Sequence, residues 1–226
     1  MVDSFYLGAY WGSRHQDLET VVQLTIKTLI GLQSIDEQFS NLYELGRSRK
    51  QALTSKINLN TVEIEQLYKK RLKKTDIDEQ GKNRIGYRLS LWTGQADDES
   101  IGLSFVAGAS SMITGNLCLI NFPYKFEIKD RLLKFEKIKS IVDLLIDNWQ
   151  PDKLILTSKK ISGELAGMND TGWITYKKNI SNAPKLGRNI IYDPNYKKGH
   201  LFHLRTDNGM VYDYGLIEDL KLLGGL

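Results

Sequence analysis

Residues 5–14 read Phe-Tyr-Leu-Gly-Ala-Tyr-Trp-Gly-Ser-Arg (FYLGAYWGSR). Aromatic and aliphatic residues run to Tyr10 and Gly12 interrupts them, which predicts a strand over Phe5–Tyr10. Odd and even positions of a strand face opposite sides of its sheet, and both sets are apolar here. We therefore expect this strand in the middle of a sheet. Gly8 would allow a ring or a backbone to approach closely, and Arg14 would meet a nearby carboxylate. These uses favour a structural segment over a ligand-binding loop.

The sequence predicts four helices. Ser13 and Gln16 have the spacing of a capping box for a first helix, whose apolar residues recur at helical intervals up to Leu32. Asn60 has the same capping role in a second helix. The longest helix is expected over Asp130–Trp149, and Pro151 ends it. A short terminal helix is expected over Leu216–Leu223.

Strands outnumber helices and mostly follow one another directly. The stretch Gly46–Leu53 is expected to pair back with the short strand at Asn41–Leu45. This order predicts an α+β fold with one domain over residues 1–226, in which a largely antiparallel central sheet is packed by two main helices. The later strands are expected at Asn41–Leu45, Arg84–Trp92, Ile101–Ala107, Leu117–Phe122, Lys153–Thr157, Gly172–Tyr176, Asn189–Tyr192 and Leu201–Arg205.

Composition restricts the compartment and the partners. Cys118 is the single cysteine, so no disulfide forms within the chain, which favours a reducing, cytoplasmic location. The start of the chain lacks the basic and apolar segments of a secretory signal. Residues 100–124 carry no charge over a length that would span a bilayer, but serines, asparagines and a Thr114-Gly115-Asn116 turn favour two buried strands. A net charge of +4 permits an acidic partner without requiring nucleic acid.

Catalytic and metal-binding patterns are weak. The chain contains no GxxxxGK[ST], GxGxxG, HExxH or GxSxG motif. His200 and His203 are the best metal candidates, but residues three apart in a strand face opposite sides. His15 lies near the first helix cap without an evident nucleophile to activate. We therefore expect no metal, no cofactor and no catalytic residue.

Acidic residues gather in three predicted loops. Solvated loop charge is the ordinary interpretation of such groups. The functional alternative is contact with a basic protein partner, because acidic loops directed at a nuclease cleft mimic phosphates. The first group is Asp36-Glu37. The residues expected to contact a partner are Asp76, Asp78 and Glu79 in the second loop and Asp97, Asp98 and Glu99 in the third.

Lys69–Lys74 (KKRLKK) is the most basic run of the chain. It would form one face of the second helix, where it could touch nucleic acid phosphates. Few aromatic residues interleave with it, and acidic residues follow at once. A solvated helix face is therefore favoured over a nucleic-acid site.

Five segments in order resemble the immunity protein 52 family of bacterial polymorphic toxin systems. Together they extend over roughly residues 5–205. They are GAYWGSR at 8–14, Leu42-Tyr43 with GRSRKQAL at 46–53, LSLWTG at 89–94, Trp149 with Pro151-Asp152, and GWITY at 172–176.

The resemblance implies a cytoplasmic antitoxin without catalytic activity, which protects the producing cell by binding a cognate toxin in bacterial competition, as in type VI secretion. In this family the toxin is often a nuclease with a restriction-endonuclease-like fold. Gln150 departs from the acidic residue expected there, and the positive net charge argues against simple phosphate mimicry. The alternatives are a nucleic-acid-modifying enzyme that uses carboxylates with His200 or His203, and a nucleic-acid-binding module built on residues 69–74. The oligomeric state stays open.

Overall fold

The computed structural model describes residues 3–111, 113–165 and 170–223. Within these residues the strands form one nine-stranded sheet in the order β2-β3-β4-β5-β1-β6-β7-β9-β8, in which every neighbouring pair is antiparallel. The predicted α+β class and antiparallel sheet are confirmed. The strands are β1 (Phe5–Trp11), β2 (Tyr43–Glu44), β3 (Tyr87–Trp92), β4 (Gly102–Ala107), β5 (Asn116–Asn121), β6 (Lys153–Ser158), β7 (Ile174–Lys177), β8 (Ile190–Tyr196) and β9 (Gly199–Leu204).

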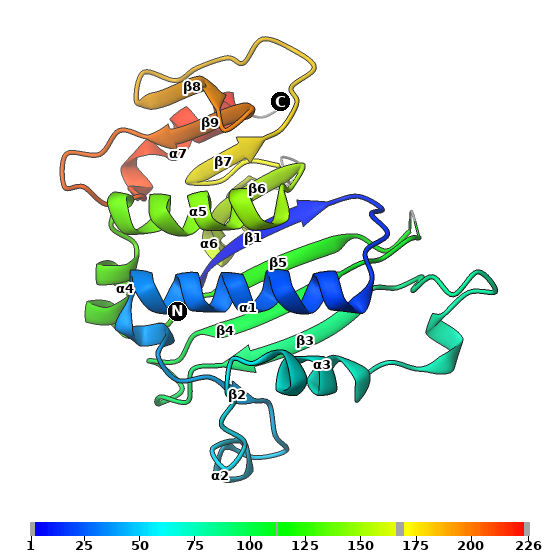
Figure 1. The fold of residues 1–226 in the computed structure, drawn as a ribbon. Coiled ribbons are helices and arrows are strands. Elements are labelled where there is room, and N and C mark those ends of the chain that lie inside the picture. The colour runs from blue at the N-terminus through cyan, green and yellow to red at the C-terminus, as the bar shows by residue number, and fades with distance from the viewer. Residues whose placement is uncertain (1–2, 112, 166–169, 224–226) are drawn as a thin grey trace.

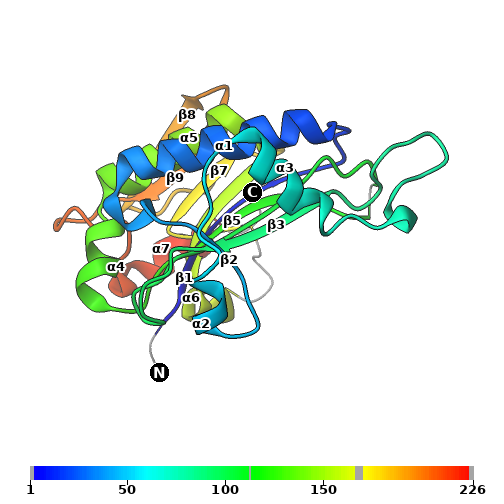
Figure 2. The same ribbon diagram turned by 60° about the horizontal axis from the view of Figure 1, so that its bottom comes forward.

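Helices lie on both sides of this sheet, but unequally. Figure 1 shows α1 and α5 in front of the central strands with α3 beside them, so the two expected main helices are confirmed. Figure 2 places α6 and α7 on the opposite side. The helices are α1 (Leu18–Ile35), α2 (Arg49–Ala52), α3 (Thr61–Lys69), α4 (Phe126–Leu132), α5 (Phe135–Trp149), α6 (Lys159–Glu164) and α7 (Ile217–Leu222). The 3₁₀ turns are η1 (Glu37–Phe39), η2 (Lys74–Asp76) and η3 (Tyr214–Leu216).

β1 is the fifth strand of the sheet, between β5 and β6, as expected from its apolar character on both faces. Its odd positions, from Phe5 to Trp11, are buried on the side of α1 and α5. Tyr6 and Tyr10 on the other face remain partly exposed. The strand is therefore central, but only one of its faces is fully covered.

The tryptophan of α5 ties the helix layer to β1. Trp149 stacks on Trp11 with ring centroids 5.3 Å apart, and its indole N–H donates to the Thr28 hydroxyl of α1 at 3.0 Å. Both tryptophans are almost completely buried. Such a pair contributes both buried apolar area and a fixed ring geometry.

Arg14 meets backbone carbonyls and not the carboxylate expected from the sequence. Its guanidinium donates to the carbonyl oxygens of Trp149 at 2.7 Å and Gln150 at 3.0 Å. These groups lie at the C-terminal end of α5, where carbonyls lack helical partners and the helix dipole favours a cation. Arg14 thus fixes the end of the β1 segment to the end of the longest helix.

The cap of α1 differs from the prediction. Asp17 is the N-cap, and its carboxylate accepts from the backbone N–H of Thr20 at 2.7 Å. Ser13 instead donates to the carbonyl of Ser110 at 2.7 Å, a contact between distant segments. The expected cap of the second helix is confirmed, because the Asn60 side chain accepts from the N–H of Glu63 in α3.

The single helix expected over 130–149 is two helices. α4 ends at Leu132 and α5 begins at Phe135. Lys134 is extended between them and forms a β-bridge with Met210. Residues 133–135 exchange backbone hydrogen bonds with residues 209–211 from the C-terminal region, and these bonds replace helical ones.

Residues 46–53 do not pair back with the preceding strand as expected. They contain the short helix α2, and the return pairing comes three residues later, where Tyr43 bridges to Lys56. The close approach of the Ala52 backbone to Gly46 explains the turn, because a side chain on residue 46 would collide with it. The chain therefore completes the short helix α2 before it pairs with Tyr43.

The uncharged stretch of residues 100–124 contributes β4 and β5, as expected. No helix within the described ranges combines the length and the apolar character that crossing a bilayer requires.

Candidate protein-binding surfaces

The two acidic loops chosen from the sequence lie at opposite ends of one strand. Residues 76–79 precede β3 and residues 97–99 follow it. A strand of six residues is roughly 20 Å long, so the six acidic residues form two separate groups. A partner that contacts both groups must extend along the sheet.

Two of the three acidic side chains in the first loop stabilise the loop itself. The Asp76 carboxylate accepts from the N–H of Lys73 at 3.0 Å, and the Asp78 carboxylate accepts from the N–H groups of Gln80 and Lys82 at 2.9 and 2.8 Å. Side chains of this type commonly organise turns in this way. Glu79 is exposed.

The second loop presents acidic side chains on a fixed backbone. The carbonyl of Asp98 accepts from the N–H groups of Tyr124 and Lys125 at 2.8 and 2.7 Å, and Glu99 forms an ion pair with Lys125. Asp97 and Asp98 are exposed. The neighbouring Tyr124 is 48% exposed. This loop therefore offers two free-standing carboxylates beside an aromatic side chain without needing to become ordered on binding.

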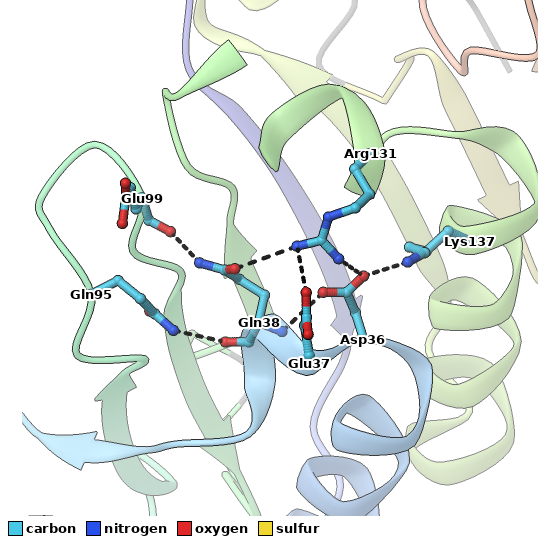
Figure 3. Close-up of polar contacts among 7 residues, drawn as sticks. All are labelled: Asp36, Glu37, Gln38, Gln95, Glu99, Arg131 and Lys137. Carbon is cyan, nitrogen blue, oxygen red and sulfur yellow. Dashed lines mark hydrogen bonds and ion pairs between the residues drawn. The ribbon is translucent and has the colours of Figure 1, made fainter. Parts of the chain in front are cut away.

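A polar cluster around the buried Asp36 holds the base of this loop, and Figure 3 shows its members. The carboxylate of Asp36, after the end of α1, forms ion pairs with Arg131 and Lys137. It also accepts from the N–H of Gln38 at 2.9 Å. The Gln38 side chain then donates to the carbonyl of Glu99 at 2.7 Å. The acidic loop is thus connected to α1, α4 and α5.

The electrostatics of Asp36 follow from these contacts. Burial alone would raise the pKa of this carboxyl group, but hydrogen bonds from Lys137, the Gln38 N–H and Arg131 outweigh burial and lower the pKa below its ordinary value. Sequence reasoning treated Asp36-Glu37 as solvated loop charge, which is wrong for Asp36 because its side chain is completely buried. Glu37 is exposed.

A second surface was not expected from the sequence. The face of β1, β3, β4 and β5 that points away from α1 and α5 carries partly exposed apolar side chains, and we call it the open face. Two hollows flank Tyr10 on it, with volumes of about 270 and 320 Å³, and both include Lys153 in their walls. The apolar members of the open face are Tyr6, Tyr10, Trp92, Val106, Leu117 and Leu119.

The histidines do not converge on one site. β9 contains both His200 and His203, and its pairing with β7 places them on opposite faces. His203 packs against the Phe135 ring, and burial lowers its pKa. The Tyr192 hydroxyl lies 2.9 Å from the His200 ring nitrogen. In the described ranges no group of three or more His, Cys, Asp or Glu residues is arranged to hold a metal ion.

The basic run is not one helix face, contrary to the prediction. α3 ends at Lys69, which pairs with Glu65 of the same helix. Lys70 and Arg71 both contact the Glu44 carboxylate of β2. Lys74 begins a separate 3₁₀ turn. The turn after α3 divides the charges between two elements, and ion pairs with Glu65 and Glu44 engage Lys69, Lys70 and Arg71.

Comparisons with known proteins give the family of this chain and a protein of similar fold. A family model described as Immunity protein 52 matches residues 3–213. The structure of the Pseudomonas aeruginosa T6SS protein PA0821 is similar, with a TM-score of 0.54 and 10% sequence identity, over 98% of this chain and 76% of that chain. At this identity the likeness concerns the fold. No curated protein matches the chain.

Proposed function

The chain belongs to the immunity protein 52 family, and from this premise we propose that it binds a cognate bacterial toxin and neutralises it in a tight protein–protein complex. The observation that carries the proposal is the family match over residues 3–213, which includes every aromatic and glycine-rich segment singled out in the sequence. Membership of an immunity protein family favours binding over catalysis.

The burial of tryptophans in the family segments supports a structural role for these side chains. Trp11 and Trp149 pack against each other, and Trp173 is completely buried. These residues build the scaffold, which leaves the outer surface to recognise the toxin. A specific complex of this kind buries on the order of 1,600 Å² in total, and a few side chains contribute most of its affinity.

The toxin that we propose is a nuclease with a restriction-endonuclease-like fold, delivered by type VI secretion and met in the cytoplasm. The similar structure is that of a T6SS protein, which supports this setting, and the lone buried Cys118 suits a reducing compartment. Asp97 and Asp98 are the acidic contacts best placed to face a basic toxin surface. Asp76, Asp78, Glu79 and Glu99 are proposed as further contacts, although most of them also stabilise their own loops.

Co-expression tests the proposal. A toxin encoded beside this gene should stop growth when it is expressed alone, and cells should survive when this chain is expressed with it. The two proteins should copurify, and purified chain should abolish the toxin's activity at an equimolar ratio. A toxin from an unrelated family, expressed with this chain, is the specificity control. Survival without a physical complex, or neither rescue nor copurification, contradicts the proposal.

A further inference from the structure

The ring of Tyr10 lies directly over Gly8 on the open face. A Cβ atom placed on residue 8 would be 2.2 Å from the Tyr10 hydroxyl oxygen and 2.5 Å from the ring carbon that carries it. Any larger residue at position 8 therefore forces the ring to move. The close approach of a ring that Gly8 was expected to allow is made by Tyr10 of the same strand.

A cation and the sheet hold this ring from its other sides. The Lys153 ammonium lies 5.6 Å from the Tyr10 ring centroid, within the range of a cation–π contact. Lys153 is positioned by an ion pair with Asp170. Leu117 is the cross-strand neighbour of Tyr10 on β5. The tyrosine is therefore ordered before any partner arrives, which reduces the entropy lost on binding.

The surroundings of Tyr10 match the centre of a protein interface. One hollow lies between β1, β6 and α6, and the other lies where β1 ends and β5 begins. A partner side chain entering each hollow would enclose the ring and remove it from water. Preordered tyrosines flanked by such hollows are typical of residues that dominate protein–protein affinity.

The charge of the open face indicates the partner's chemistry. On β1, β3, β4 and β5 the described positions of this face carry one charged residue, Arg88, and neither Asp nor Glu, whereas the charge of Lys153 on the adjoining β6 is paired with Asp170. Arg88, Val106, Leu117 and Tyr10 lie in one row across the sheet, so an exposed guanidinium ends an apolar row. A complementary surface presents apolar side chains with a carboxylate opposite Arg88.

We propose that the open face is the docking surface for the cognate toxin, that Tyr10 is its central contact residue, and that the toxin presents an apolar projection flanked by a carboxylate. This inference rests on the proposed function and specifies where that function is performed. The loop that carries the exposed Asp97 and Asp98 connects Trp92 of β3 to Gly102 of β4, so it lies at one end of the sheet that bears the open face.

Toxin affinity measured by calorimetry on purified variants tests the inference. Tyr10→Ala should raise Kd at least about 30-fold, whereas Tyr10→Phe, which keeps the ring, should stay within about threefold of wild type. Gly8→Ala should raise Kd about tenfold by displacing the ring while the strand is kept. Gly31→Ala is the matched control, because its added methyl would likewise displace the end of a flexible side chain, Leu144, but on the helix side.

The outcomes separate the two proposals. If wild-type protein does not bind the toxin, the proposed function fails. If wild type binds, and both Tyr10→Ala and Gly8→Ala bind the toxin as tightly as wild type does, the proposed docking surface is wrong although the proposed function stands. Hydroxyl-radical footprinting of wild-type protein covers the case in which a variant does not fold. Oxidation of Tyr10 and Leu117 should fall in the complex while Val62, which is 64% exposed on α3, is unchanged; the opposite pattern overturns the inference.

Discussion

Arg131 donates to the buried carboxylate of Asp36, and this contact joins the residue after α1 to the last turn of α4. Lys137 of α5 binds the same carboxylate, so one acidic side chain holds three helices together. Through Gln38 it also holds the loop that displays Asp97 and Asp98. The rigidity of a surface loop thus depends on a residue that solvent does not reach.

Asp36→Asn should lower the free energy of unfolding by about 2–3 kcal/mol. Removing one member of a buried ion pair costs about 3–5 kcal/mol, and the partial exposure of Arg131 and Lys137 reduces that figure. Urea denaturation measures the change. Glu37→Gln is the matched control, because Glu37 is 85% exposed and should shift stability by less than about 0.5 kcal/mol. Equal effects of the two variants would contradict the role given to Asp36.

Acid should destabilise the protein, and Asp36 should account for part of the effect. Its pKa is lower in the folded chain than in the unfolded chain, so its contribution is fully present above the unfolded value of about 4 and is lost as the pH falls through the folded value. The pKa values of Asp3 and Asp170 are lowered as well. Burial alone would raise them, but hydrogen bonds to the two carboxylates and, for Asp170, the charges of Lys153 and Lys177 outweigh burial. Urea midpoints at pH 7, 4 and 3 should therefore fall less steeply in Asp36→Asn than in wild type. Parallel curves would exclude Asp36 as a source of the pH dependence.

Arg14→Ala should lower the free energy of unfolding by about 2 kcal/mol, because two hydrogen bonds from a charged group to the end of α5 are lost. Arg14→Lys should recover less than half of this loss, since an ammonium lacks the planar fork that reaches both carbonyls. Chemical denaturation provides the measurement, with Lys27→Ala on the exposed side of α1 as control. Full recovery by lysine would mean that charge alone matters at this position.

The double variant Asp97→Asn/Asp98→Asn should slow association with the toxin several-fold and weaken the salt dependence of the association rate. Exposed charges at the edge of an interface act mainly on the rate of encounter. Stopped-flow mixing at low and physiological salt checks this, and Asp207→Asn removes an exposed charge from a different loop as control. An unchanged rate at low salt would place these carboxylates outside the interface.

Local signals predicted most elements of the fold. The apolar character of Phe5–Tyr10 placed β1 centrally, Asn60 capped α3, and Pro151 marked the end of α5. The break at Lys134 was not predictable, because residues 209–211, which replace its helical hydrogen bonds, come from the far end of the chain. Ser13 and Asp17 are both suitable caps, and only the contact of Ser13 with Ser110 decides between them.

The two candidate binding surfaces were harder to predict from the sequence than the fold. Apolar residues on both faces of β1 indicated burial on both sides, whereas on the second face α6 reaches β1 at Tyr6, whose hydroxyl lies 3.0 Å from that of Ser162, and does not cover the whole strand. Tyr10 is therefore partly exposed for a reason that depends on helix placement. The Asp36-Glu37 pair resembles any acidic turn until Arg131 and Lys137, which lie 95 and 101 residues after Asp36, are brought beside it.

The central position of β1 has a consequence for how the sheet assembles. The two sheet neighbours of β1 are residues 116–121 and 153–158, more than a hundred positions further along the chain. Pairings between such distant segments form slowly, because a long loop must close before they contribute to stability. The two halves of the sheet therefore join late in folding, at the strand on which both depend.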